Sequence, residues 1–309
     1  MSKIVCLGIL VVDVIAKPVD SIPDKGKLSL VDTVELHSGG CAANTAIDLA
    51  KIGEDVGIIG LVGNDGFGDF LFNELSKEKV NTNGLRRTGK TNSSVSLVLS
   101  NSDGERSFIH CLGTNGIFRE SDIDMSVIEK CDVLFVAGSL LMPSFDGEPT
   151  ARILKRAKKM GKYTVLDTCW DSTGRWMRTI GPCLPYLDLF IPSIEEAQML
   201  SGKTDEREIA ADFLERGVLN VVIKFGSRGC YIKNKNEEHY VDAYKVDAVD
   251  TNGAGDSFVA GFITGLVNGW DLEKCGKFAN AVGAHCVMKV GASTGIKSKR
   301  EILQFMEGR

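Results

Sequence analysis

The 309-residue sequence predicts an α/β fold in which a parallel central sheet is flanked by helices. Short, continuous apolar runs alternate with amphipathic segments of helical spacing, a pattern typical of parallel sheets covered on both faces. No linker, low-complexity segment or internal repeat interrupts this alternation. Residues 92–111 depart from the rhythm, because they hold two alternating apolar–polar runs joined by a turn that includes Gly104, which indicates a separate antiparallel strand pair.

The N-terminal part begins with a strand predicted over residues 4–7. The run over residues 9–15 that follows is apolar apart from Asp13. Because burying a carboxylate is costly, Asp13 needs either hydrogen bonds from backbone amides or a ligand. Loose alternation over residues 28–36 indicates a further strand.

The remaining elements follow the strand–helix alternation. Strands are predicted over residues 58–61, 133–137, 163–167, 187–191 and 221–225. Helices are predicted over residues 42–52, 69–78, 150–160, 195–200, 207–216, 257–268 and 272–289. Ligands of such sheets bind beyond the carboxyl ends of the strands. The polar residues expected together at that edge are Asp167, Ser193, Lys224 and Asp256.

Composition excludes several classes of function. The formal net charge is −5 and no sustained basic run is present, which disfavours a nucleic-acid or anionic-membrane partner. The nine cysteines are odd in number and form no Cys-x-x-Cys pair, which indicates reduced thiols. With neither a signal peptide nor an apolar run long enough to span a bilayer, we expect a cytoplasmic protein without a membrane partner.

A small-residue turn, Gly253-Ala254-Gly255, precedes the helix predicted from residue 257, with Asp256 at the helix start. A helix N-terminus offers free N–H groups and partial positive charge, and glycines let an anion approach them. Asp256 is therefore either a helix cap or a general base beside bound phosphate. The turn is not a P-loop, because no Lys-Ser/Thr pair follows the glycines.

Two segments carry a family resemblance. Residues 250–256, Asp-Thr-Asn-Gly-Ala-Gly-Asp, resemble the C-terminal signature of the ribokinase-like (PfkB-type) carbohydrate kinases. Residues 38–46, Ser-Gly-Gly-Cys-Ala-Ala-Asn-Thr-Ala, resemble the second signature of that family. The resemblance covers essentially the whole chain and implies one ribokinase-like domain over residues 1–309. It also implies a small β-sheet lid from about residues 9–36 and 92–112. Exposed edges of the lid strands would invite uncontrolled pairing, so we expect a homodimer formed through the lid.

The resemblance also assigns roles to residues. It implies that Asp256 is the catalytic base and that amides of the preceding turn stabilise the moving phosphoryl group, namely those of Gly253, Ala254 and Gly255. The sugar-binding residues that it implies are Asp13, Gly39, Gly40 and Asn44. The nucleotide-binding residues that it implies are Lys224, Gly226, Gly229 and Asn280. A plain glycine-rich hairpin over residues 224–232 and a buried helical Asn280 bonded to backbone stay open as structural alternatives.

The metal assignments also rest on the resemblance. It implies ATP with Mg²⁺, which Glu196 and Ser193 would hold through water, although the family carries Asn where this chain has Ser193. It also implies a potassium ion, with Asp250 and the loop over residues 291–295 as the candidate site.

The function implied is ATP-dependent phosphorylation of a primary hydroxyl of a sugar or sugar derivative. Ribokinases carry Asn and Lys where this chain has Val11 and Cys41, which disfavours ribose and leaves fructose-like, deoxy-ketose and unusual hexose substrates. A nucleoside or sugar-phosphate kinase of the same fold is one alternative. A catalytically silent ATP- or sugar-binding regulator is another.

Overall fold

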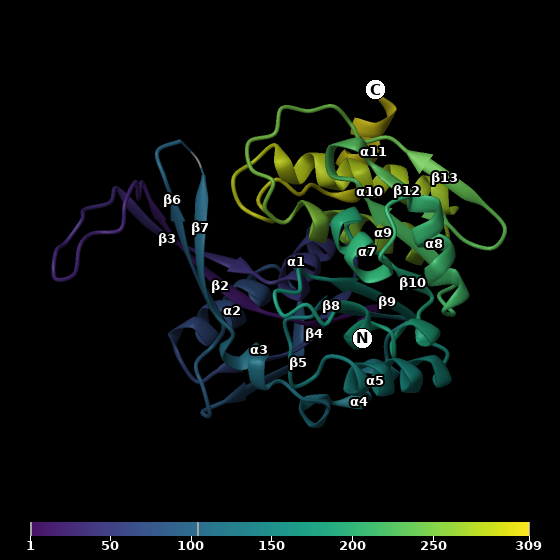
Figure 1. Cartoon of the computed structure of the whole chain (residues 1–309), viewed down its shortest axis with the longest axis horizontal. Helices are drawn as coiled ribbons and strands as arrows, with labels where there is room; N and C mark the ends of the chain where they lie inside the picture. Colours follow the sequence, from purple (N-terminus) through teal and green to yellow (C-terminus); the bar gives the residue numbers. More distant parts are fainter. Residues whose placement is uncertain (1, 104, 309) are drawn as a thin grey trace.

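The computed structural model describes residues 2–103 and 105–308, and Gly104 of the predicted turn lies outside them. Its main sheet has nine strands, in the spatial order β13-β12-β11-β10-β9-β8-β1-β4-β5 (Figure 1). Their bounds are β1 Ile4–Gly8, β4 Val56–Gly63, β5 Asn81–Thr88, β8 Val133–Ser139, β9 Tyr163–Thr168, β10 Leu189–Phe190, β11 Asn220–Lys224, β12 Cys230–Lys233 and β13 Glu238–Val241.

Within this sheet, the seven neighbouring strands β11-β10-β9-β8-β1-β4-β5 pair in parallel, as the sequence predicts. Strands β12 and β13 add an antiparallel edge. The edge strand β5 was not predicted, because most of its residues are polar and outside the core. The glycine-rich turn after β11 does lead into an antiparallel hairpin with β12, with four residue pairs from Val221↔Lys233 to Lys224↔Cys230.

Helices cover both faces of this sheet (Figure 1). One hydrophobic cluster packs beneath α1 (Cys41–Ile52), α2 (Gly66–Lys77), α9 (Ala254–Val267), α10 (Leu272–Val287) and α11 (Lys299–Glu307). The other packs beneath α4 (Met125–Glu129), α5 (Glu148–Lys159), α6 (Trp176–Ile180), α7 (Ile194–Ser201) and α8 (Glu206–Glu215). Alternate residues of β1 enter the two clusters, Ile4 and Cys6 the first, Val5 and Leu7 the second. A short helix, α3 (Gly113–Ile117), follows the lid strands.

A second sheet of four strands projects from the body in the order β3-β2-β6-β7 (Figure 1). Its bounds are β2 Val11–Lys17, β3 Thr33–Gly39, β6 Val95–Ser100 and β7 Arg106–Cys111. We call this sheet the lid. The strand predicted over 28–36 was wrong at its start, because β3 begins only at Thr33, which pairs with Lys17. The next residue of the partner strand, Pro18, has no N–H group and ends the pairing. Leu28 and Leu30 lie in the exposed connection before β3.

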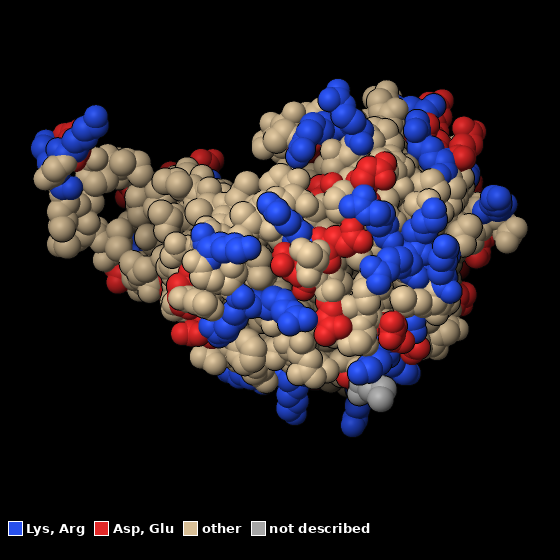
Figure 2. Space-filling model, turned by 90° about the horizontal axis from the view of Figure 1, so that it is seen from below, with Lys and Arg blue, Asp and Glu red and all other residues tan. Residues whose placement is uncertain are grey.

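Figure 2 shows acidic and basic side chains interspersed over one face of the body, with the lid projecting as a separate arm. Among the described residues, no helix combines the length and the apolar character that crossing a membrane requires.

Candidate functional site

Helix α9 begins one turn earlier than the sequence predicts. Gly253 is its N-cap, with a φ of 76° that favours glycine. A Cβ atom on Gly253 would lie 2.5 Å from the Cβ of Ala292, so the loop after α10 also requires glycine here. Asp256 is therefore the third residue of the helix, and the interpretation of its side chain as the helix cap is wrong.

The carboxylate of Asp256 is held from helix α1. Asn44 donates its amide Nδ2–H to Oδ2 of Asp256 over 2.8 Å, so the predicted sugar-binding Asn44 contacts the predicted base. Burial raises the pKa of Asp256, and Asn44, Lys224 and Cys41 oppose this rise. A carboxylate with a raised pKa is a better proton acceptor than a solvated one.

Lys224 lies at the end of β11 and forms an ion pair with Asp167, whose Oδ2 is 2.6 Å from Nζ. Although burial lowers the pKa of Lys224, the carboxylates of Asp167 and Glu196 raise it on balance, so the ammonium stays charged. A Cβ on Gly255 would lie 3.7 Å from this Nζ, so the ammonium sits beside the start of α9.

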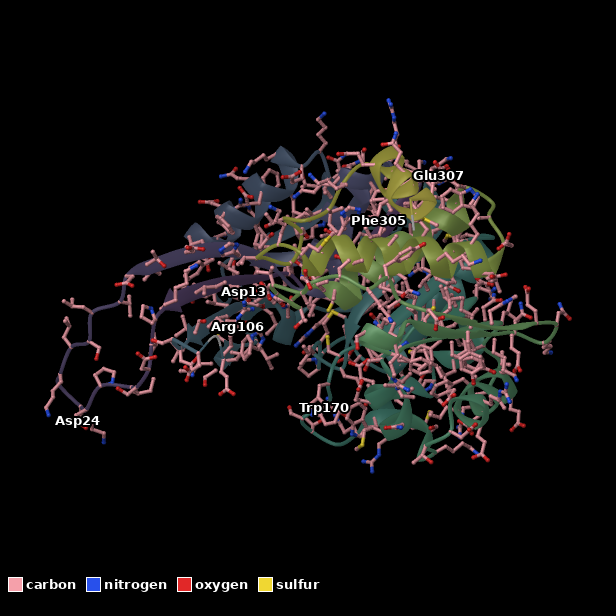
Figure 3. All side chains as sticks on the ribbon, turned by 90° about the horizontal axis from the view of Figure 1, so that it is seen from above. Asp13, Asp24, Arg106, Trp170, Phe305 and Glu307 are labelled. Atoms are coloured by element: carbon pink, nitrogen blue, oxygen red, sulfur yellow. The ribbon has the colours of Figure 1, made fainter. Side chains whose placement is uncertain are left out.

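The prediction that the polar strand-end residues share one edge is confirmed. Asp167, Ser193, Lys224 and Asp256 all line a pocket of about 440 Å³, which we call the rim pocket. Cys41, Cys169 and Trp170 also line it, and the two thiols approach to 3.4 Å. Cys41 belongs to the signature over residues 38–46, whereas Cys169 and Trp170 were not singled out from the sequence as site residues, because their positions carry no motif. Figure 3 places Trp170 on the body.

A second pocket, of about 530 Å³, lies on the other side of Lys224 and is mainly apolar. We call it the apolar pocket. Its lining includes Gly226, Gly229, Tyr244, Phe258, Asn280, Ala284 and Val287. It shares Lys224, Gly226 and Gly255 with the rim pocket, so the two pockets meet at the start of α9.

Asn280 is bonded to backbone and also lines the apolar pocket. Its Nδ2 donates to the carbonyls of Val241 and Asp242, at 3.0 and 3.1 Å, which is the structural alternative. The residue nevertheless lines the apolar pocket, so it both fixes the β13 end and shapes the pocket wall. Gly229, with a φ of 94°, leaves no room for a Cβ, which would meet the Val241 carbonyl oxygen at 2.0 Å.

The two predicted sugar-binding glycines, Gly39 and Gly40, are also required by close packing. A Cβ on Gly39 would lie 2.4 Å from Oδ2 of Asp13, and one on Gly40 would lie 2.6 Å from the carbonyl oxygen of Ile9. Close approach of β2 to the start of α1 thus requires both glycines. It also brings the carboxylate of Asp13 directly against the Gly-Gly turn.

Strand register places a polar row across the lid. Asp13 pairs with His37 of β3 and with Ser96 of β6, and Ser96 pairs with His110 of β7. Cross-strand partners point to the same face, so these four residues share one face of the lid. Ser96 Oγ lies 3.0 Å from Nδ1 of His110. Burial raises the pKa of Asp13, while Ser96, His37 and Arg106 oppose the rise.

Strand register also explains the position of Arg106, a residue that the sequence did not single out. It lies on the same strand face as His110, four residues earlier on β7, where β7 pairs with Ser100 at the end of β6, and Figure 3 shows it near Asp13. Its Nη1 lies 3.2 Å from Oδ1 of Asp250. Burial would raise the pKa of Asp250, but the N–H groups of Gly291 and Asn252 and the guanidinium of Arg106 lower it.

The predicted magnesium segment forms a capping box at the start of α7. Ser193 N–H donates to Oε2 of Glu196 over 3.0 Å, and Glu196 N–H donates to Ser193 Oγ over 3.3 Å. Thr168 Oγ also donates to Oε2 of Glu196. Within residues 2–103 and 105–308, no three acidic, Cys or His side chains converge as a metal site. Glu196 lines the rim pocket, so the residues present fit a contact with Mg²⁺ through water but not direct ligation by a set of residues.

Comparison with known proteins adds a family match. A family model described as pfkB family carbohydrate kinase matches residues 1–299. A probable fructokinase-5 of Arabidopsis thaliana is 29% identical over 312 residues, covering 94% of this chain and 95% of the relative. A 2-dehydro-3-deoxygluconokinase of Bacillus subtilis is 27% identical over 296 residues, covering 92% and 91%. An uncharacterized sugar kinase of Pyrococcus horikoshii, solved in complex with ATP, superposes with a TM-score of 0.80 at 28% identity over 97% of each chain. The predicted fold class is confirmed.

Proposed function

Because the chain belongs to the pfkB family of carbohydrate kinases and is a sugar kinase, we propose that it transfers the terminal phosphoryl group of ATP to a primary hydroxyl of a sugar or sugar derivative. The observation that carries this proposal is the meeting of the apolar pocket and the rim pocket at Gly255, beside Lys224 and Asp256. ATP is favoured as the donor because the Pyrococcus horikoshii relative was solved with it. The whole chain acts as one ribokinase-like domain with its lid over the sugar.

The apolar pocket suits an adenine ring and its ribose. Its lining by Tyr244, Phe258 and Val287 offers apolar contact, while the glycines after β11 let backbone approach the nucleotide. The phosphates would then extend toward Gly255 and Lys224, where the start of α9 and the ammonium attract negative charge. Of the turn amides, that of Ala254 donates to the Thr251 carbonyl at 3.3 Å in this state, so its role in binding phosphate requires that bond to loosen.

Asp256 acts as the general base. Its Oδ2 accepts the Asn44 amide proton, which fixes the direction of the carboxylate while the sugar hydroxyl approaches. The base takes the hydroxyl proton as the bond to phosphorus forms, and Lys224 with the helix start stabilises the charge on the transferred group. When bound, Mg²⁺ would neutralise charge on the ATP phosphates, and Glu196, which lines the rim pocket, would hold one of its waters.

The sugar would lie between the Gly-Gly turn and the polar row of the lid. Asp13, Ser96 and His110 provide a carboxylate, a hydroxyl and an imidazole for hydroxyl groups of the substrate. Val11 is buried and Cys41 contacts Cys169, so neither supplies a polar contact for ribose. We therefore favour a fructose-like or deoxy-ketose substrate, in line with the names of the two relatives. A sugar phosphate is disfavoured, because Arg106 is already paired with Asp250.

The test is release of ADP in a coupled assay with fructose, 2-dehydro-3-deoxygluconate, ribose and nucleosides as acceptors. We expect turnover with a hexose-type acceptor, and loss of that turnover in Asp256→Asn purified in the same way. Binding of ATP and sugar by calorimetry without ADP release from any acceptor would instead identify a silent regulator. Preference for a nucleoside would move the chain to the nucleoside-kinase alternative.

A further inference from the structure

The loop over residues 291–295 and the carboxylate of Asp250 form the candidate potassium site, and their polar atoms can be followed one by one. Asp250 Oδ2 accepts the Gly291 N–H over 2.9 Å, and Oδ1 accepts the Asn252 N–H over 3.0 Å. Oδ1 also lies 3.2 Å from Nη1 of Arg106. Both carboxylate oxygens are therefore held by donors of the chain itself.

Two carbonyl oxygens of the loop are used in the same way. The Ser293 carbonyl accepts Nζ–H of Lys51 over 2.9 Å, and the Ala292 carbonyl accepts the Cys286 thiol over 3.1 Å. A monovalent cation needs several oxygen ligands whose lone pairs are free, as well as the absence of a competing positive charge. Here one guanidinium and one ammonium already lie on the oxygens that would surround it, so these residues do not fit a potassium ion.

Resting on the sugar-kinase function proposed above, we propose that Arg106 of the lid is a built-in cation for Asp250, which makes turnover independent of potassium. The pair also ties lid position to the turn Gly253-Ala254-Gly255, which we call the anion turn. The side chain of Asp250 is 5% exposed and that of Arg106 26%, so the pair is shielded from solvent more than an ordinary surface pair. The loop over residues 291–295 contacts the anion turn, because Ala292 packs against Gly253 at the start of α9.

This chain of contacts makes Arg106 a positioning residue. Arg106 lies on β7, whereas Asp250, Gly291 and Gly253 belong to the body. When the lid moves away, the guanidinium leaves with it and Asp250 keeps only its two backbone donors. Without sugar to draw the lid toward the body, the loop over residues 291–295, which supports the start of α9, therefore has the fewest restraining contacts.

The experiment compares initial rates in potassium chloride and in tetramethylammonium chloride at equal ionic strength, with saturating ATP, Mg²⁺ and sugar. The wild-type rates should agree within about twofold. Arg106→Ala should lose at least about tenfold in tetramethylammonium chloride, since removing one partner leaves a shielded carboxylate unpaired, and should regain several-fold as potassium is added. Arg106→Gln is the second variant, in case Arg106→Ala does not fold. Arg87→Ala, which removes the surface pair with Asp69, is the matched control and should behave like wild type.

Thermal unfolding in the same two salts gives a readout that needs no turnover. Potassium should raise the Tm of the Arg106 variants over that in tetramethylammonium, and should leave the wild type unchanged. The inference is overturned if potassium activates the wild type more than tenfold, or if the Arg106 variants show no potassium dependence in rate and Tm. Absence of turnover in every salt would instead count against the proposed function, while the Tm comparison still decides the role of Arg106.

Discussion

The central sheet and the lid differ in how their strands are covered. Every residue of β8 is buried between the two helical layers, whereas β7 of the lid is exposed along nearly its whole length. The body therefore holds its reactive groups in a packed environment. Asp256, for example, is fixed by Asn44 from a neighbouring helix, while Asp13 lies on a sheet that projects from the body as an arm.

This difference in burial assigns different tasks to the body and the lid. The rim of the body carries the charges that must stay in place during phosphoryl transfer, Lys224, Asp167 and Asp256. The lid carries a polar row on one face and an apolar surface on the other, and it contributes only a few residues, such as Val12, to the core. We expect substitutions on the body to act mainly on kcat, and substitutions on the lid to act on KM or on association.

The largest effect is expected at Asp256. Asp256→Asn removes the base but leaves a side chain of the same size beside Asn44, so kcat should fall by about 10²–10⁴-fold. ATP affinity, measured by calorimetry, should stay near the wild-type value because the apolar pocket is untouched. Turnover within a few-fold of wild type would show that the carboxylate serves structure alone.

The corresponding substitution on the lid is Asp13→Ala. Losing one or two charge-assisted hydrogen bonds to sugar hydroxyls should raise the sugar KM by about 10- to 100-fold. Sugar-independent hydrolysis of ATP should change little, because Asp13 lines neither the apolar pocket nor the rim pocket. Sugar affinity that stays at the wild-type level in a folded variant would contradict the substrate role of the lid row.

The magnesium segment of the rim can be tested without breaking its helix. Glu196→Gln keeps a capping-box residue at the third position of α7 while removing the charge, and should raise the Mg²⁺ concentration for half-maximal rate about tenfold. Ser193→Asn keeps a favoured N-cap and should shift that concentration only modestly. If Glu196→Gln shows the wild-type Mg²⁺ dependence at fixed ATP, Glu196 is a capping residue only.

The outer face of the lid provides the test of assembly. By register, Val14, Leu36, Leu97 and Ile109 share the face opposite the polar row, and the last three are 42–58% exposed. We propose that a second copy covers this apolar face in a homodimer, since an uncovered sheet of this kind invites uncontrolled pairing.

Ile109→Asp should convert that dimer to monomer in sedimentation velocity. Leu219→Asp, at a residue of the body that is 49% exposed, is the matched control and should leave the mass unchanged. A wild-type protein that is monomeric and fully active at assay concentration would contradict assembly through the lid.

The sequence predicted the body better than the lid for a physical reason. Continuous apolar strands such as residues 133–137 and the helical spacing after Ser257 are local signals, and both became core elements. The row formed by Asp13, Ser96 and His110 depends on strand register, which brings together residues nearly a hundred positions apart. The pair of Arg106 and Asp250 depends on how the lid meets the body, which no local pattern encodes.

The smallest effect is expected at Asp48 inside the body, where close packing buries a carboxyl group and so lowers stability at neutral pH. Asp48 of α1 is fully buried and accepts the Ser257 hydroxyl of α9 over 2.6 Å. Its Oδ1 and the nearby Ser293 Oγ have no hydrogen-bond partner. Burial raises the pKa of Asp48 to about 7, and the hydrogen bond from Ser257 opposes this rise only in part. The folded protein therefore binds this proton more tightly than the unfolded chain does.

The sign of the pH dependence follows from that difference. A raised carboxyl pKa contributes stability that is complete below the unfolded value of about 3.9 and is lost as pH rises toward 7. Asp48→Asn removes the titrating group and keeps an acceptor for Ser257, so its Tm should exceed that of wild type by a few degrees at pH 8. At pH 4 the two should be close, and the exposed control Asp132→Asn should follow wild type throughout. Parallel Tm curves for wild type and Asp48→Asn between pH 5 and 8 would show that Asp48 keeps the same charge state across this range.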